Sequence, residues 1–181
     1  PFNPVSLALG AEASFVARTH DMDRKHMQEM FRRAYHHDGA SMVEVYQNCN
    51  VFNDGAFATI TKKDSRDDML IDLRHGERIQ FGSEGQFGVV RQDGGVEIVN
   101  VADVGLDALL VHDENRQDPS TAFALSRLAS GPTTPTPVGV FRATERAEYG
   151  AAMATQVADV AAESGKGDLA SLLRSQPTWE V

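Results

Sequence analysis

The segment VEVYQNCNVFNDGAF, residues 43 to 57, contains the one cysteine of the chain. Cys49 follows an alternating run of β-branched and aromatic residues, and it lies among Asn48, Asn50 and Asn53. Two interpretations are open. A lone cysteine is often an inert, buried side chain. Alternatively, asparagines supply turn geometry and amide donors that stabilise a thiolate ligand of a metal.

A metal site at Cys49 needs ligands from elsewhere, because one thiolate completes neither a tetrahedral zinc site nor an iron–sulfur cluster. A zinc site that combines Cys49 with His36 or His112 would still lack ligands. His36 and His37 are adjacent, so on a helix they point about 100° apart. We interpret this pair as cations favoured by the dipole at a helix C-terminus.

His112 is followed by two carboxylates, Asp113 and Glu114, at the end of an apolar run. A base beside two acids could act in catalysis, but a solvated loop or a helix cap explains the same residues. The common nucleotide-loop and nucleophile motifs, GxGxxG, the P-loop, GxSxG and HExxH, are missing from the sequence. From these residues alone, the chain is an α/β domain of unknown purpose.

The elements that position Cys49 form a predicted βαβ unit. Residues 3–9 predict a short helix with Asn3 as its cap, and residues 13–18 predict a buried strand. Residues 41–47 predict the next strand, after a helix that ends near His37. The apolar face of that helix consists of Met27, Met30, Phe31, Ala34 and Tyr35, and Asp21 or Asp23 can cap it. Strands joined in this way are parallel, and open α/β sheets bind ligands beyond their carboxyl ends, where Cys49 lies.

The rest of the chain predicts short strands and then a helical arm. Residues 87–100 predict a hairpin, residues 107–114 a strand, and Asp118-Pro119 the start of a helix. Residues 130–139, SGPTTPTPVG, predict an extended linker. The tail, residues 144–163, predicts an alanine-rich helix with Tyr149, Met153, Val157 and Val160 on one side. We therefore expect three regions: 1–56 as part of an α/β domain, 57–129 as a small mixed extension, and 130–181 as linker and arm.

Charge and hydropathy exclude several classes of partner. The formal net charge is -9, with basic residues scattered along the sequence. This balance disfavours nucleic acid and anionic membranes, which need clustered Lys and Arg. No run reaches the roughly 18 to 20 apolar residues of a membrane helix, and the start lacks a basic signal-peptide flank, so we expect a cytoplasmic protein. The first residues read as the interior of a domain, so we also expect a piece of a longer chain.

Four segments carry a resemblance to a known family. NPVSLALGAEASFVART and EVYQNCNVFNDGAF, and later HDENRQDPSTAFALSRL and TPTPVGVFR, resemble the β subunit of 2-oxoacid:ferredoxin oxidoreductases, nearest the 2-oxoglutarate type. The resemblance covers nearly the whole chain but only the C-terminal half of that subunit. The N-terminal half of the family's subunit carries a CxxC pair, a further cysteine and a GDGD-type motif, and residues 1–181 contain none of them.

The resemblance implies a fold, cofactors and partners. It implies the C-terminal half of a thiamine-diphosphate-binding parallel-sheet domain, with Cys49 as the last ligand of a 4Fe-4S cluster. Thiamine diphosphate, Mg²⁺ and the other thiolates would be held by the N-terminal half of the β subunit. Together with the α subunit, in a heterotetramer, the enzyme would convert 2-oxoglutarate and coenzyme A to succinyl-CoA, as in the tricarboxylic acid cycle, and pass electrons to ferredoxin. This piece would not be active alone.

Two alternatives to that function stay open. Within the family, the substrate is pyruvate or a branched-chain 2-oxoacid. Outside it, the chain is a non-catalytic α/β assembly domain. Because ferredoxins are usually acidic, we expect ferredoxin to dock on a local basic patch, to which Arg32 and Arg33 are the candidates in this chain.

Overall fold

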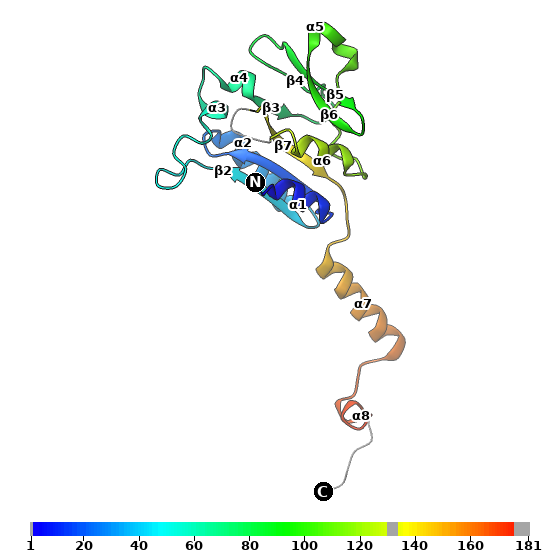
Figure 1. Ribbon diagram of the computed structural model, residues 1–181. Coiled ribbons are helices and arrows are strands. Elements are labelled where there is room, and N and C mark those ends of the chain that lie inside the picture. Colours follow the sequence, from blue (N-terminus) through cyan, green and yellow to red (C-terminus); the bar gives the residue numbers. More distant parts are fainter. Residues whose placement is uncertain (1, 130–133, 176–181) are drawn as a thin grey trace. The chain divides into compact units, whose positions relative to one another are not determined.

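The computed structural model describes residues 2–129 and 134–175. The chain divides into two compact units, Pro1–Arg146 and Ala147–Val181, and each is described by itself. The first unit contains a four-stranded sheet with the strand order β2-β1-β7-β3 and a three-stranded sheet with the order β4-β5-β6 (Figure 1). The predicted region boundary after residue 56 falls inside the first unit.

The main sheet is built on the predicted βαβ unit. β1 (Phe15–His20) and β2 (Ser41–Tyr46) are parallel, and α2 (Arg24–His36) connects them. β7 (Thr136–Ala143) pairs antiparallel to β1 and parallel to β3 (Leu70–Leu73). The fold is therefore α/β with a largely parallel sheet, and its one antiparallel pairing was not predicted.

Alternate residues of β1 serve two separate apolar clusters, as the two-residue period of a strand requires. Phe15 and Ala17 pack with Met30 of α2. Val16 belongs to a larger cluster with helices α1 (Pro4–Gly10) and α6 (Ser120–Ser126). The buried members of that cluster are Val5, Leu9, Val16, Ile71, Leu73, Ile79, Phe81, Val89, Ala122, Leu125 and Phe141.

Hydrogen bonds of capping residues fix the two helices nearest the start of the chain. Asn3 caps α1 by accepting from the Ser6 N–H at 3.0 Å, and its amide donates to the Ser126 carbonyl at 2.9 Å. α1 is thereby tied to α6. Of the two predicted caps for α2, Asp23 accepts from the His26 N–H, which holds the pKa of Asp23 below its usual value.

Strand β7 corrects the prediction that residues 130–139 are a linker. Residues 136–139 belong to β7 and are buried, while residues 130–133 lie outside the described residues. Proline is normally excluded from the middle of a sheet because it has no N–H. Here β7 pairs with β1 only from Gly139 onward, so Pro137 has a strand neighbour on the β3 side alone.

The second sheet contains the predicted hairpin. β5 (Phe87–Gln92) and β6 (Gly95–Asn100) are joined by Asp93 and Gly94, which both have positive φ, as this tight turn requires. The predicted strand at 107–114 is wrong. The segment begins as a 3₁₀ turn (Leu106–Ala108) and then pairs through one isolated bridge at Val111. The remaining elements of the unit are α3 (Ala58–Thr61), α4 (Arg66–Met69), β4 (Gln80–Phe81) and α5 (Val101–Val104).

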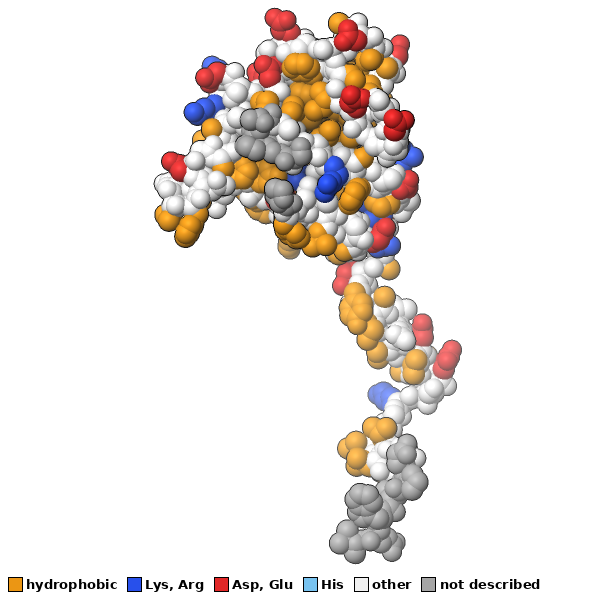
Figure 2. All heavy atoms as spheres, in the orientation of Figure 1, with side chains coloured by type: hydrophobic (Ala, Val, Ile, Leu, Met, Phe, Trp, Pro, Cys, Tyr) orange, Lys and Arg blue, Asp and Glu red, His pale blue; other side chains and the backbone are white. Residues whose placement is uncertain are grey.

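The second unit contains α7 (Tyr149–Ser164) and α8 (Leu169–Leu173), which confirms the predicted C-terminal helix. Its large apolar side chains are exposed, and those of α7 gather along the helix (Figure 2). They are Tyr149, Met153, Val157, Val160, Leu169, Leu172 and Leu173. Helices of this length gain most of their stability from packing, so α7 has the character of a segment that a partner covers. None of the helices in the described ranges is long and apolar enough to cross a membrane.

Substitution of Gly139 tests the close approach of β7 to β3. Gly139 has φ +107°, and a Cβ there would meet the Leu73 carbonyl oxygen at 2.6 Å. We expect Gly139→Ala to lower the free energy of unfolding in urea by about 2–3 kcal/mol. Gly10→Ala is the matched control, because a Cβ at Gly10 meets no atom within 4 Å. Equal effects of the two substitutions would contradict the contact.

Candidate functional site

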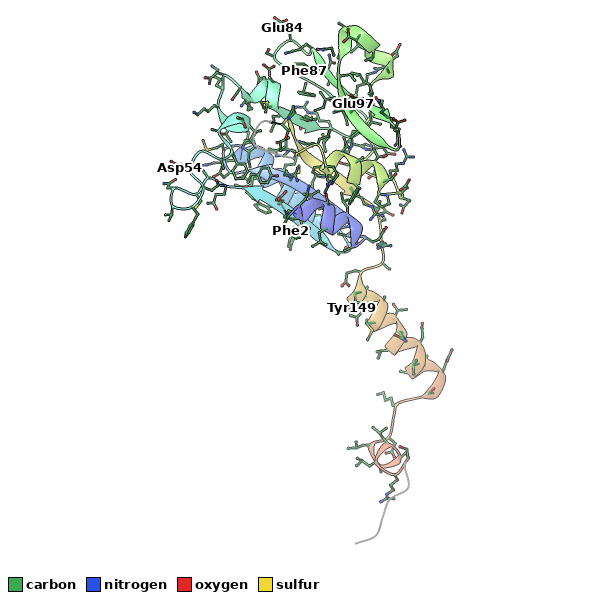
Figure 3. All side chains as sticks on the ribbon, viewed as in Figure 1. Phe2, Asp54, Glu84, Phe87, Glu97 and Tyr149 are labelled. Carbon is green, nitrogen blue, oxygen red and sulfur yellow. The ribbon has the colours of Figure 1, made fainter. Side chains whose placement is uncertain are left out.

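The loop after β2 carries Cys49 beyond the carboxyl end of the strand, where the sequence places it. The Asn48 side chain organises this loop. Its oxygen accepts from the Gly55 N–H at 2.8 Å, and its amide donates to Asp54 at 2.9 Å and to Asn50 at 3.1 Å. Asp54 marks the loop in Figure 3. The asparagines thus have the turn-forming role that the sequence predicts.

Cys49 is partly exposed, so the buried interpretation does not apply. Hydrogen bonds from the backbone N–H of Phe52, then Val51 and Asn53, hold the pKa of the Cys49 thiol below its usual value. Successive N–H groups that point at one atom form an anion-binding concavity, a type of site that also occurs around iron–sulfur centres. The loop therefore favours a thiolate.

The tip of the same loop is apolar and solvent-exposed. Val51 is 80% exposed and Phe52 is 90% exposed. Exposed large apolar side chains next to a functional group are typical of a surface that another protein covers. The residues that orient the Cys49 sulfur are therefore also the most exposed apolar residues of this loop.

Further metal ligands do not surround Cys49 within the described ranges. In residues 2–129 and 134–175, no group of three His, Cys, Asp or Glu side chains could hold a metal ion. The zinc alternative fails for His112, which is 1% exposed and bonds through Nε2 to the Val140 carbonyl at 2.7 Å. A metal at Cys49 would take its other ligands from outside these residues.

The interpretation of residues 112–114 as a solvated loop or cap is wrong for two of the three residues. Burial lowers the pKa of His112, which favours the neutral imidazole. Glu114 is also buried and accepts a hydrogen bond from Arg33 at 2.7 Å. Both side chains therefore stabilise the fold where β7 and α2 pack. Sequence spacing gave no signal of this, because Arg33, Glu114 and Val140 are far apart in the chain.

The histidine pair at the end of α2 is likewise only partly as predicted. His37 bonds through Nε2 to the Ser14 hydroxyl at 2.9 Å, and burial lowers its pKa, so the cationic form is disfavoured. His36 is exposed and contacts the Tyr35 ring. Since Arg33 is paired with Glu114, only Arg32 of the two proposed docking cations is free on the surface.

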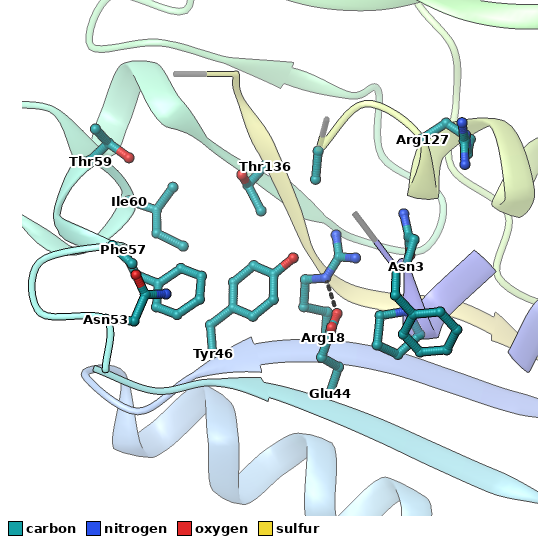
Figure 4. A pocket seen from close by; sticks show the side chains of 14 residues that line it. Asn3, Arg18, Glu44, Tyr46, Asn53, Phe57, Thr59, Ile60, Arg127 and Thr136 are labelled. Carbon is teal, nitrogen blue, oxygen red and sulfur yellow. Dashed lines mark hydrogen bonds and ion pairs between the residues drawn. The ribbon is translucent and has the colours of Figure 1, made fainter. Parts of the chain in front are cut away.

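A cavity of about 680 Å³ lies over β1 and β2, next to the Cys49 loop (Figure 4). This volume is in the usual range of ligand sites. The described residues that line it are Phe2, Asn3, Pro4, Arg18, Glu44, Tyr46, Asn53, Ala56, Phe57, Thr59, Ile60, Arg127, Ala129 and Thr136. Asn53, Ala56 and Phe57 come from the segment that follows Cys49, so one segment forms both the thiol loop and a cavity wall.

Arg18 forms the base of the cavity, although its side chain is only 1% exposed. Its Nε donates to Glu44 Oε2 at 2.6 Å, and its Nη1 donates to the Pro137 carbonyl at 3.3 Å. The guanidinium also lies 5.1 Å from the Tyr46 ring and 5.3 Å from the Phe141 ring. Such contacts stabilise a desolvated cation. The sequence analysis missed Arg18, although Arg18 and Glu44 are partners in the register of two predicted parallel strands.

Tyr46 connects the ion pair to the cavity wall. Its ring stacks on Phe57 with centroids 4.4 Å apart and planes 13° apart. Burial raises the pKa of Tyr46, so its hydroxyl stays protonated. The cavity therefore combines a fixed cation, a neutral hydroxyl and a flat aromatic wall.

Comparison with known proteins gives consistent results. The chain is 46% identical to 2-oxoglutarate oxidoreductase subunit KorB of Mycobacterium tuberculosis over 100% of this chain and 49% of that protein. It is 40% identical over 52 residues to the 2-oxoacid:ferredoxin oxidoreductase subunit beta of Saccharolobus solfataricus, which covers 29% of this chain and 17% of that protein. No family model matches.

The structure is similar to a solved 2-oxoglutarate:ferredoxin oxidoreductase from Magnetococcus marinus. The TM-score is 0.59 at 18% sequence identity, over 98% of this chain and 45% of that chain. This likeness shows the fold, which is mixed α/β with a parallel-rich sheet.

Fold and sequence together define a class: the chain belongs to the β subunits of the 2-oxoacid:ferredoxin oxidoreductases. Within that class, the match to the 2-oxoglutarate oxidoreductase subunit KorB extends over all of this chain, and the chain spans about half the length of this curated relative. The resemblance identified from the sequence is thus confirmed.

Alkylation kinetics test the environment of the Cys49 sulfur. Because the fold lowers the thiol pKa, the native chain should reach its half-maximal rate with iodoacetamide at a lower pH than the urea-denatured chain. Asn48→Ala, which releases the loop, should move the native midpoint toward the denatured one. Native and denatured midpoints that coincide would show that the N–H groups do not stabilise the thiolate.

Proposed function

We propose that this chain is part of the β subunit of a 2-oxoglutarate:ferredoxin oxidoreductase. The enzyme would carry out CoA-dependent oxidative decarboxylation of 2-oxoglutarate to succinyl-CoA and pass the electrons through an iron–sulfur cluster to ferredoxin. The observation that carries this proposal is the 46% identity over the whole chain to a 2-oxoglutarate oxidoreductase subunit. The similar structure from Magnetococcus marinus contains 2-oxoglutarate, coenzyme A and succinyl-CoA, which agrees with this choice of substrates.

Cys49 is the residue of this chain that fits an iron–sulfur cluster. Its loop favours the thiolate form, which is the form that binds iron, and the N–H groups around the sulfur tune such a centre. A 4Fe-4S cluster needs four thiolates, so three must come from the N-terminal half of the β subunit. When bound, the cluster supplies one-electron transfer. The share of this chain is to hold one thiolate, orient it through Asn48 and cover it with the apolar loop tip.

Unlike the cluster, thiamine diphosphate and Mg²⁺ are not assigned to any residue of this chain. In the described ranges no set of carboxylates gathers as a magnesium site, so we assign neither group to residues of this chain. The N-terminal half of the β subunit would hold both. The sheet described here would then form one wall of the cofactor domain.

The exposed helix α7 fits a subunit of a larger assembly. Its large apolar side chains are exposed, as expected of an arm that packs on another subunit. We place the chain in a cytoplasmic heterotetramer with the α subunit and the N-terminal half of the β subunit.

A second substrate class stays a candidate, because the archaeal relative is described only as a 2-oxoacid enzyme. The assembled complex should reduce a low-potential dye with 2-oxoglutarate at least about tenfold more efficiently than with pyruvate or a branched 2-oxoacid, since unpaired polar groups in a site cost that much or more. Preference for pyruvate or the branched acid would move the assignment to that class. No turnover with any of the three would favour the non-catalytic assembly domain.

Substitution of Cys49 tests the cluster assignment. In the assembled complex, Cys49→Ser should lower the iron content and bleach the visible absorption, because a neutral hydroxyl is a far weaker ligand than a thiolate. Val104→Ala on α5 is the control, since it also removes part of an exposed apolar side chain but lies outside the Cys49 loop. Unchanged iron and electron transfer in Cys49→Ser would overturn the assignment.

A further inference from the structure

We infer that the cavity over β1 and β2 is a binding site for a monocarboxylate with an apolar body, anchored by Arg18. A buried guanidinium is stable only when its donors find acceptors. Nε and Nη1 of Arg18 have theirs in Glu44 and Pro137. Among the described residues no acceptor bonds to Nη2, and in Figure 4 the guanidinium extends from Glu44 into the cavity that Arg18 lines.

The orientation of Arg18 is fixed before any ligand enters. Glu44 holds one edge, and the rings of Tyr46 and Phe141 lie close to the guanidinium. Binding therefore does not have to restrict the long side chain, which removes one of the usual entropic costs of recognition. A carboxylate is the group that matches the planar donors of an arginine.

The net charge of the cavity lining favours a ligand that carries one negative charge. The charged side chains in the lining are Arg18, Arg127 and Glu44, which leaves one positive charge in excess, although the whole chain carries -9. A phosphate group brings about -1.5 to -2 at neutral pH, and it would approach Arg18 beside the Glu44 carboxylate. The lining therefore favours a monoanion over a phosphate.

The walls define the body of the ligand. Phe57 stacks on Tyr46 and forms a flat apolar surface, and Ile60, Ala56 and Pro4 add aliphatic contacts. Ligand sites typically combine such apolar walls with a few fixed polar groups. The ligand class is accordingly a small carboxylic acid with an aliphatic or aromatic chain.

The test compares an acid with its neutral analogue on the 181-residue chain. Ligand-observed NMR titrations would measure the Kd of 4-methylpentanoate and of 4-methylpentanamide. We expect the acid to bind at least about tenfold more tightly than the amide, because a charge-assisted hydrogen bond is worth that ratio or more. Inorganic phosphate should not displace the acid. Equal binding of acid and amide, or displacement by phosphate at matched concentration, would overturn the inference.

Substitutions test whether the acid binds at Arg18. The double substitution Arg18→Met with Glu44→Gln removes both charges together, so no unpaired charge is left buried. It should abolish the difference between acid and amide. Arg116→Gln, at an exposed arginine outside the cavity lining, is the matched control and should change the Kd of the acid less than about threefold, because exposed charges are screened.

A further variant keeps the inference testable if the double variant does not fold. Ala56→Phe narrows the cavity and leaves the Arg18 ion pair intact. It should weaken the binding of acid and amide alike. If Ala56→Phe binds the acid as tightly as the native chain does, the ligand lies outside the cavity and the inference is wrong.

A final titration distinguishes a 2-oxoacid ligand from other carboxylic acids. 4-Methyl-2-oxopentanoate has the skeleton of 4-methylpentanoate plus the keto group of a 2-oxoacid. Tighter binding of the keto acid would support a 2-oxoacid ligand, and equal binding would support a general carboxylate site. All these measurements concern binding to the chain alone and need no iron, so their failure would leave the assignment of Cys49 standing.

Discussion

The position of β7 between β1 and β3 is the constraint on which the other features of the first unit depend. This strand brings a late segment of the chain into contact with the βαβ unit at its start. Its backbone also supplies acceptors to buried polar side chains: the Pro137 carbonyl to Arg18 and the Val140 carbonyl to His112. Without β7, an arginine and a histidine would be buried with fewer partners, at a cost of about 1–3 kcal/mol for each lost acceptor or more for the charge.

Features with a local cause could be predicted from the sequence. The βαβ unit follows from hydrophobic periodicity, the Asn3 cap from one side chain, and the hairpin from the Asp-Gly-Gly turn. Features that depend on distant partners could not. Strand β7 looks like a linker because it is rich in proline and threonine, and only the register with β1 shows why Pro137 is tolerated there. The irregular segment near Val111 has the composition of a strand but only one bridge to pair with.

The same distinction separates the two parts of the candidate site. The Cys49 loop is local: its asparagines, its turn and its place after β2 can all be read from residues 43–57. The cavity is not local, because Arg18, Glu44 and Arg127 line one cavity only after the chain has folded. A charged residue inside a predicted buried strand, opposite a residue of the other sign in the next strand, is nevertheless a signal that sequence analysis can use.

The unburied apolar side of α7 has a consequence for the life of the subunit in the cell. An unassembled chain would expose an apolar helix of the kind that chaperones and quality-control proteases bind. A partner that covered this helix would remove that signal, so an unassembled copy would be degraded while an assembled copy would be spared. The arm would in this way keep the amounts of the different subunits in balance.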